Sequence, residues 1–167
     1  MGRAVAANGR VAFAEPMFRG ANPVTLDAKG RLAMPTRFRE QIVARSQGRL
    51  VATVDRSDRC LLIYPYPEWE AIERKLMQLP TLNPAARRLQ RLMIGHATEL
   101  DLDGAGRMLI PPTLREYANL SRQAMLIGQG ARFELWDQAQ WSERREDWLK
   151  ADETTEPLPP ELESLSI

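Results

Sequence analysis

The chain has 167 residues, of which 44% are hydrophobic and 27% are charged, as is ordinary for a globular protein with a packed core. Its net charge of +1 at pH 7 is unevenly distributed, because the stretch from Ala151 onward is acidic and contains no Lys or Arg. One cysteine and one histidine, Cys60 and His96, exclude an intramolecular disulfide and metal sites of several Cys or His residues, and no apolar run approaches the roughly 18 residues of a membrane helix.

Residues 1–16 show no hydrophobic period and lack the apolar core of a signal peptide. We expect them to be a leader, or residues foreign to the native protein that precede a start at Met17.

Residues 17–81 then contain short elements separated by turn residues. In chain order we expect strands over Pro23–Leu26 and Arg31–Met34, a helix from Pro35 to about Val43, strands over Arg49–Val54 and Cys60–Tyr64, and a longer helix with an apolar stripe of Trp69, Ile72, Leu76 and Leu79.

A connecting helix is predicted over residues 82–96, because Asn83 is a typical N-cap and Pro84 suits the first helical position. Its apolar side contains Leu89, Leu92 and Met93. Its basic residues, which a solvated face or a subunit contact explains better than DNA does, are Arg87, Arg88 and Arg91.

Residues 97–150 repeat the first unit. The run from Leu26 to Pro35 recurs from Leu102 to Pro111 with the same spacing of Asp, Gly, Arg and Pro. Further correspondences are Leu50-Val51 with Leu126-Ile127, Ile63-Tyr64 with Leu135-Trp136, and Trp69 with Trp141. The repeat predicts strands over Thr98–Leu102, Arg107–Ile110, Ala124–Ile127 and Arg132–Trp136, a short helix from Pro111 to about Asn119, and a longer helix with Asp137 as N-cap.

The last stretch, residues 151–167, is acidic and rich in proline, and we expect a mobile tail there.

Neither repeat can easily fold alone, because short strands of about four to six residues form little sheet area. Two copies in one chain can bury their apolar faces against each other around a pseudo-two-fold axis. The sequence therefore predicts an α+β, β-rich fold with a small core that helices flank.

The most informative motif is the turn Asp27-x-x-x-Arg31, which recurs as Asp103-x-x-x-Arg107. An aspartate at the start of a tight turn accepts hydrogen bonds from the following N–H groups, and glycine permits positive φ. Two interpretations stay open: an Asp–Arg clamp that only fixes the hairpin, or an arginine that projects toward a ligand. The residues expected to organise the turns are Asp27, Gly30, Asp103 and Gly106.

Arg31 has basic neighbours, since Lys29 stands in the same turn and Arg37 and Arg39 follow on the next helix. Such a cluster of like charges is unfavourable unless an anion is present. The second copy is less basic, with Ala105 at the position of Lys29. Most basic residues of the chain are arginines, which suit phosphates and guanine edges, although a compositional bias explains their number equally well.

The remaining candidates do not support catalysis. A structural or capping role suits His96, Cys60 fits a small core residue, and Trp69, Trp141 and Trp148 have helical core spacing. No nucleophile–base pair is recognisable. We therefore expect a non-enzymatic protein with no cofactor, no metal site and no membrane partner, in a reducing cytoplasm.

Four motifs together resemble the MraZ family of bacterial regulators, which are encoded at the head of the division and cell-wall gene cluster. The resemblance covers about Met17 to Trp148, so residues 1–16 lie outside it and the acidic tail matches only loosely. The motifs are Met17-Phe18-Arg19-Gly20, the two Asp-x-x-x-Arg turns, Leu62-Ile63-Tyr64-Pro65 before Pro67-Glu68-Trp69, and Leu92-Met93-Ile94-Gly95-His96-Ala97.

The resemblance implies two tandem swapped-hairpin units of the SpoVT-AbrB type per chain, and a ring-like homo-oligomer. It also implies sequence-specific binding to tandem G-rich boxes in double-stranded DNA upstream of the protein's own operon, with a role as repressor at the nucleoid. The resemblance implies that the DNA-binding residues lie in the two turns, at Lys29, Arg31 and Arg107. We expect Arg37 to bind DNA as well, because it belongs to the basic cluster around Arg31. The alternative is an oligomerisation or partner-binding module of the same fold, antitoxin-like, without specific DNA readout.

Overall fold

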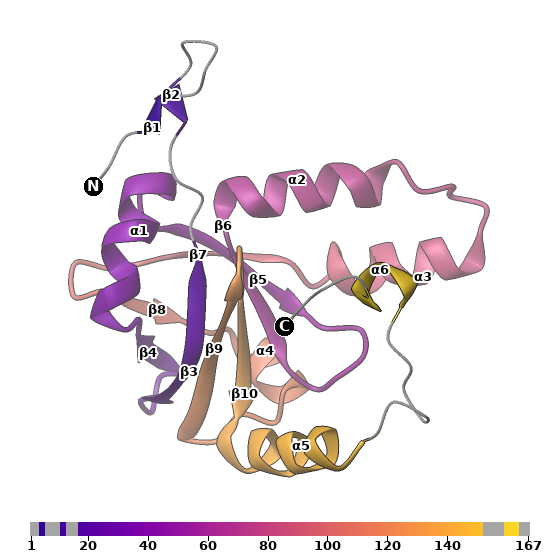
Figure 1. The fold of residues 1–167 in the computed structure, drawn as a ribbon. Coiled ribbons are helices and arrows are strands. Elements are labelled where there is room, and N and C mark those ends of the chain that lie inside the picture. Colours follow the sequence, from indigo (N-terminus) through magenta and orange to yellow (C-terminus); the bar gives the residue numbers. More distant parts are fainter. Residues whose placement is uncertain (1–3, 6–10, 13–16, 152–158, 164–167) are drawn as a thin grey trace.

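The computed structural model describes residues 4–5, 11–12, 17–151 and 159–163. An antiparallel sheet in the order β3-β9-β10-β6-β5-β7 forms the centre of the molecule (Figure 1). The predicted fold class, α+β and rich in strands, is confirmed. The sheet strands are β3 (Phe18–Thr25), β5 (Arg49–Val54), β6 (Leu61–Pro65), β7 (Thr98–Asp101), β9 (Gln123–Gly130) and β10 (Phe133–Asp137).

The two repeats are interleaved because their strands pair across the repeat boundary. In the sheet, β3 of the first repeat pairs with β9 of the second, and β7 of the second pairs with β5 of the first. A separate two-stranded ribbon consists of β4 (Arg31–Ala33) and β8 (Arg107–Leu109). The predicted turns follow β3 and β7, but the two strands that flank each turn do not pair with each other as a hairpin. They separate and pair with the other repeat, which is the swapped arrangement that the resemblance implies.

The pairing has a pseudo-two-fold axis. When each strand is exchanged with its counterpart in the other repeat, the strand order is unchanged apart from its direction. At the centre of the sheet, Leu62 of β6 pairs with Glu134 of β10, its own counterpart in the repeat. In the ribbon, Leu32 likewise pairs with its counterpart Met108. The sequence repeat is therefore a structural repeat around one axis.

Helices cover both faces of the sheet. The ribbon lies on one face together with the first helix of each repeat, and the remaining long helices lie on the other. The helices on the ribbon side are α1 (Thr36–Ser46) and α4 (Pro112–Tyr117), and those on the opposite side are α2 (Tyr66–Met77), α3 (Pro84–Met93) and α5 (Gln138–Lys150).

One predicted correspondence differs in the structure: Leu50 corresponds to Ala124 and not to Leu126. Leu26 N–H donates to Arg122 O, and its counterpart Leu102 N–H donates to Gly48 O. Arg122 and Gly48 are therefore equivalent positions, and Ala124 and Leu50 each follow two residues later. The reason lies in the helix between turn and strand, because α1 has 11 residues and α4 has 6. The second repeat therefore reaches its next strand after fewer residues.

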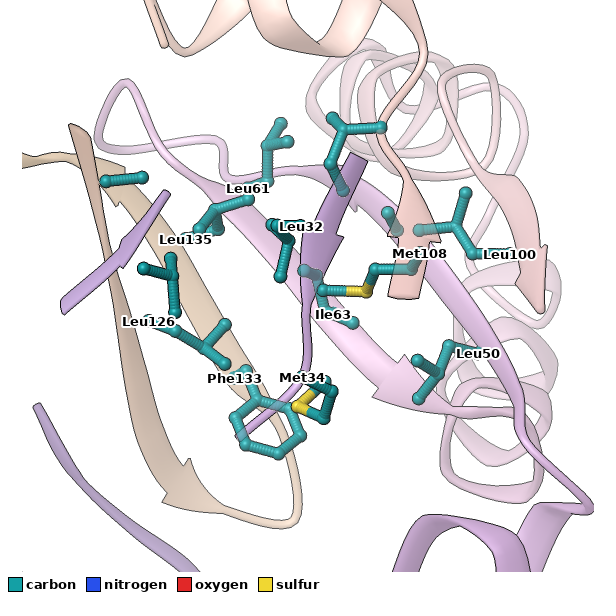
Figure 2. Packing of buried hydrophobic residues seen from close by; sticks show 14 of the residues in the cluster. Leu32, Met34, Leu50, Leu61, Ile63, Leu100, Met108, Leu126, Phe133 and Leu135 are labelled. Carbon is teal, nitrogen blue, oxygen red and sulfur yellow. The ribbon is translucent and has the colours of Figure 1, made fainter. Parts of the chain in front are cut away.

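The larger core lies between the ribbon and the sheet. Along β6, Leu61 and Ile63 face this core, whereas Leu62 belongs to the smaller cluster under α2 and α3, as the alternation of a strand requires. Figure 2 shows Leu32 and Met108 side by side, with residues of β9 and β10 on one side and residues of β5 and β7 on the other. The ribbon therefore covers the side of the core that lies opposite the sheet.

Both predicted N-caps are confirmed. Asn83 Oδ1 accepts a hydrogen bond from Ala85 N–H at 2.9 Å, and Asp137 Oδ2 accepts one from Gln140 N–H at 3.4 Å. These bonds satisfy N–H groups that the first turn of a helix leaves without partners. They begin α3 and α5 where local sequence predicts.

Three short elements lie outside this architecture. They are β1 (Ala4–Val5), β2 (Val11–Ala12), which pairs with β1, and α6 (Pro160–Glu163). The other residues of 1–16 and of 152–167 are outside the described ranges, and the predictions of a leader and a mobile tail fall largely on them. Across the described residues, no helix has the length and apolarity needed to cross a membrane.

The position of Leu32 on the axis can be tested by truncation. Leu32 is 1% exposed, so Leu32→Ala should lower the free energy of unfolding by about 2–5 kcal/mol, measured by urea denaturation. Leu82, which is 93% exposed, provides the control, and Leu82→Ala should change it by no more than about 0.5 kcal/mol. Equal effects of the two substitutions would contradict a core held together by the ribbon.

Candidate nucleic-acid interface

Each repeat has a tight turn that one aspartate organises. In the first turn, Asp27 Oδ1 accepts hydrogen bonds from the N–H groups of Lys29 and Arg31, both at 2.9 Å. Gly30 adopts a φ of +86°, a left-handed conformation that favours glycine. The second turn repeats these bonds around Asp103. The sequence motif therefore has a local structural cause in both copies.

The aspartates also orient the arginine side chains. Arg31 Nε donates to Asp27 Oδ2 at 2.7 Å, and Arg107 Nε donates to Asp103 Oδ2 at 2.9 Å. Within the described ranges these are the side-chain hydrogen bonds that the two arginines make, and both side chains remain about a third or more exposed, at 32% and 41%. The Asp–Arg pair therefore does fix each turn, as the first interpretation requires. Because the pair uses Nε, the two Nη groups of each guanidinium stay available to another partner, as the second interpretation requires.

The same contacts lower the pKa of both aspartates. At Asp27 the N–H of Arg31 is the main cause, the guanidinium of Arg31 and the N–H of Lys29 add to it, and the pKa falls from 3.8 to about 2. The pKa of Asp103 is also lowered, first by the N–H of Arg107. Both carboxylates are therefore charged at neutral pH, and each offsets one guanidinium charge.

The ribbon brings both arginines onto one surface. Because β4 and β8 are antiparallel, Arg31 lies opposite Leu109 and Arg107 lies opposite Ala33. Side chains alternate along a strand, so these four residues share the outer face while the residues between them point into the core. Along the ribbon axis, Arg31 and Arg107 lie two residue positions apart, which corresponds to about 7 Å. The resulting surface combines two oriented guanidinium groups with Leu109, which is 52% exposed.

An arginine from the other repeat covers each turn glycine. A Cβ atom at Gly30 would lie 2.6 Å from Arg115 Nε, and a Cβ atom at Gly106 would overlap Arg39 in the same way. A side chain at either turn would therefore have to displace the arginine that packs over it, in addition to adopting a positive φ. Arg39 does not join Arg31 of its own repeat, as the sequence suggests, because strand exchange places α1 beside the second turn.

Main-chain carbonyls fix these two arginines. Arg39 Nε donates to Met34 O at 2.6 Å, and Arg115 Nε donates to Ile110 O at 3.0 Å. Sequence reasoning did not single out Arg115. The repeat itself carries the signal, since Arg115 occupies the position of Arg39 and the symmetry gives both the same role.

Arg37 lies against β3. Its Nη2 donates to Arg19 O at 3.2 Å and to Asn22 Oδ1, and its guanidinium lies 4.6 Å from the centre of the Phe38 ring. These contacts engage a strand at the edge of the sheet. The DNA contact that the sequence predicts for Arg37 stays a prediction, and its observed partners are protein groups.

The cysteine and the histidine make internal contacts. Cys60 is fully buried, as predicted for a small core residue, and burial raises the pKa of its thiol. Its Sγ atom lies 3.9 Å from Asp55 Oδ2 and also near Glu134, whose pKa burial raises as well. His96 Nδ1 lies 2.8 Å from Leu92 O at the end of α3, which fits the predicted structural role.

The pH dependence of stability tests the contribution of the Asp27 carboxylate. Its folded pKa of about 2 lies below its ordinary value of 3.8, so its stabilisation is complete above about pH 4 and is lost as pH falls through 2. Asp27→Asn should lower the thermal midpoint at pH 7, and the difference from wild type should shrink as pH falls from about 4 towards 2. A difference at Asp27 that persists unchanged at pH 2 would contradict this assignment.

A pair of glycine substitutions tests the turn geometry. Gly30→Ala would place a methyl group against Arg115 at a left-handed position, and should lower the free energy of unfolding by about 1–3 kcal/mol. Gly104 has no heavy atom within 4 Å of an added Cβ, so Gly104→Ala should be close to neutral in the same urea titration. Similar effects at both positions would rule out the crowding described here.

Comparison with known proteins supports the resemblance. The chain matches the family described as "MraZ protein, putative antitoxin-like" twice, over residues 17–92 and residues 93–157. A protein of Coxiella burnetii named transcriptional regulator MraZ is 59% identical over 153 residues, which cover 90% of this chain and 100% of the relative. Relatives of the same name from Halorhodospira halophila and Pseudomonas aeruginosa are 58% and 56% identical with the same coverage. The chain belongs to the MraZ family, whose members matched here are named transcriptional regulators.

Proposed function

We propose that this protein binds double-stranded DNA upstream of its own operon in a sequence-specific manner and represses transcription there. The role of transcriptional regulator follows from its family, and it is the non-enzymatic role that the sequence predicts. The observation that carries the DNA-binding proposal is the outer face of the β4–β8 ribbon, where Arg31 and Arg107 share one surface. The major groove of B-DNA admits a two-stranded β-ribbon, so this surface can reach base edges.

The geometry suits the two arginines to guanine. An arginine specifies guanine by donating two hydrogen bonds to O6 and N7. Asp27 and Asp103 hold the Nε atoms of Arg31 and Arg107, so the Nη groups are presented in a defined direction. Less side-chain entropy is then lost on binding than for a free arginine. This arrangement fits the G-rich boxes that the family resemblance implies.

The two turns differ in charge. Lys29 is exposed beside Arg31 in the first turn, where it can contact a phosphate, while Ala105 takes its place in the second. We assign DNA contacts to Lys29, Arg31 and Arg107 on this basis. The first turn is therefore the stronger electrostatic contact of the pair.

We also propose that several copies act together as a ring-like homo-oligomer, at the nucleoid in the cytoplasm. One ribbon has few base-contacting side chains, so a single subunit should bind weakly. Copies joined in a ring raise the effective concentration of each further ribbon at neighbouring boxes. Boxes spaced by about one helical turn, roughly 34 Å, would present the same groove to successive subunits.

The second candidate is a module that binds a protein partner. Exposed apolar side chains at the connection between α2 and α3 favour it, since Met77 is 66% exposed and Leu82 is 93% exposed. Salt separates the two functions. DNA binding through several phosphates should weaken steeply between about 50 and 200 mM salt, whereas binding through apolar surface should not.

The DNA-binding proposal is tested by fluorescence anisotropy with the upstream duplex and a scrambled duplex. Arg31→Ala should cost about 1–3 kcal/mol for each guanine that the arginine recognises, and so remove most of the preference for the upstream duplex while the oligomer persists in sedimentation. Arg74→Ala is the matched control, because Arg74 also belongs to an exposed i,i+4 ion pair, with Glu70 on α2. Wild-type selectivity in Arg31→Ala would show that the site is wrongly assigned. Equal binding of the wild-type protein to both duplexes would favour the partner-binding module.

A further inference from the structure

Two arginines near the turns have no acidic partner. Among the ion pairs of the described residues, Arg31 and Arg107 are joined to aspartates, but neither Arg39 nor Arg115 takes part in one. Their Nε atoms donate to main-chain carbonyls, which leaves their positive charge uncompensated. Both side chains are partly buried, where an unpaired charge is less favourable than in water. An anion at these positions would relieve that cost.

Strand exchange places each of these arginines at the turn of the opposite repeat. Arg115 packs over Gly30, and Arg39 packs over Gly106. Each turn therefore carries two guanidinium groups. One comes from its own repeat and is held by aspartate, and the other comes from the opposite repeat and lacks a counterion.

At the first turn, Arg115 faces an open groove of about 600 Å³. Arg122 also lines this groove, and the hydroxyl-bearing residues Thr25 and Ser121 lie beside it. The carboxylate of Asp27 lines the groove as well, but its charge is paired with Arg31. The groove therefore has a net positive lining next to the side chain proposed to contact bases.

We infer that Arg115 and Arg39 bind backbone phosphates of the DNA, so that each DNA-binding turn is completed by the opposite repeat. The inference rests on the proposed function and assigns different DNA contacts to the two pairs of arginines. Arg31 and Arg107 contact bases, whereas the arginines from the opposite repeat contact phosphates and fix the register of the ribbon on the duplex. The phosphate contact is stronger at the first turn, because Arg122 lines the groove there.

The test uses the full chain, the upstream duplex and the scrambled duplex, with anisotropy measured over a series of salt concentrations. Arg115→Gln and Arg39→Gln should each weaken binding to both duplexes by the same factor. The slope of log K against log salt should fall by about one for each subunit engaged. Arg74→Gln on α2 removes the same charge far from the turns in sequence, and it should leave affinity and slope unchanged.

Lysine substitution separates a phosphate contact from a structural one. Arg115→Lys keeps the positive charge but loses the guanidinium that donates to Ile110 O. It should keep most of the affinity and the salt slope that Arg115→Gln loses. If Lys and Gln weaken binding equally, the arginine acts through the main-chain bond and the inference is overturned. Should Arg115→Gln fail to fold, Arg39→Gln and Arg39→Lys make the same comparison at the other turn, where Arg39 Nε donates to Met34 O.

The inference and the proposed function fail in different ways. A wild-type protein that binds neither duplex overturns the proposed function, and the phosphate contacts with it. Equal binding to both duplexes, with the affinity and salt slope still lowered in Arg115→Gln and Arg39→Gln, overturns sequence-specific binding alone. A wild-type protein that prefers this duplex, with Arg115→Gln and Arg39→Gln unchanged in affinity and slope, overturns the inference alone. The same holds if these variants lose sequence preference and keep their salt slope, since they would then contact bases.

Discussion

The antiparallel pairing of β4 with β8 is the contact on which the rest of the molecule depends. Beyond the ribbon itself, Met34 N–H donates to Gly106 O and Ile110 N–H donates to Gly30 O, both at 2.9 Å. These bonds tie the end of each ribbon strand to the turn of the opposite repeat. The inner face of the ribbon closes the core, and its outer face carries the arginines. One pairing therefore supplies both stability and the candidate interface.

The symmetry of the backbone does not extend to the charges. Lys29 and Arg122 lie at the first turn, whereas the corresponding positions at the second turn are Ala105 and Gly48. The backbone must stay symmetric because both halves bury the same core, but exposed side chains are free of that constraint. The two turns can therefore differ in how strongly they attract an anion while they present the same geometry.

Net charge is a poor guide to this surface. The whole chain carries only +1, and the aspartates of both turns lie directly beside the arginines. Each aspartate lowers the local positive potential but fixes the direction of a guanidinium, which favours selectivity over general attraction. The uncompensated arginines supplied by the opposite repeat restore attraction at the same place. Selectivity and attraction are thus separate properties of neighbouring side chains.

The sequence alone determined the features that depend on residues close together in the chain. The strand and helix positions, the caps at Asn83 and Asp137, and the aspartate-centred turns follow from hydrophobic periodicity and hydrogen bonds that span a few residues. The repeat also predicted a pseudo-two-fold core. Only the tertiary structure decided which strands pair, that Arg39 belongs to the opposite turn, and that Arg37 lies against β3. Strand pairing and these two placements depend on how the apolar faces of the two repeats are buried against each other. The residues that meet in this way lie far apart in the chain, so no local sequence pattern specifies which of them pair.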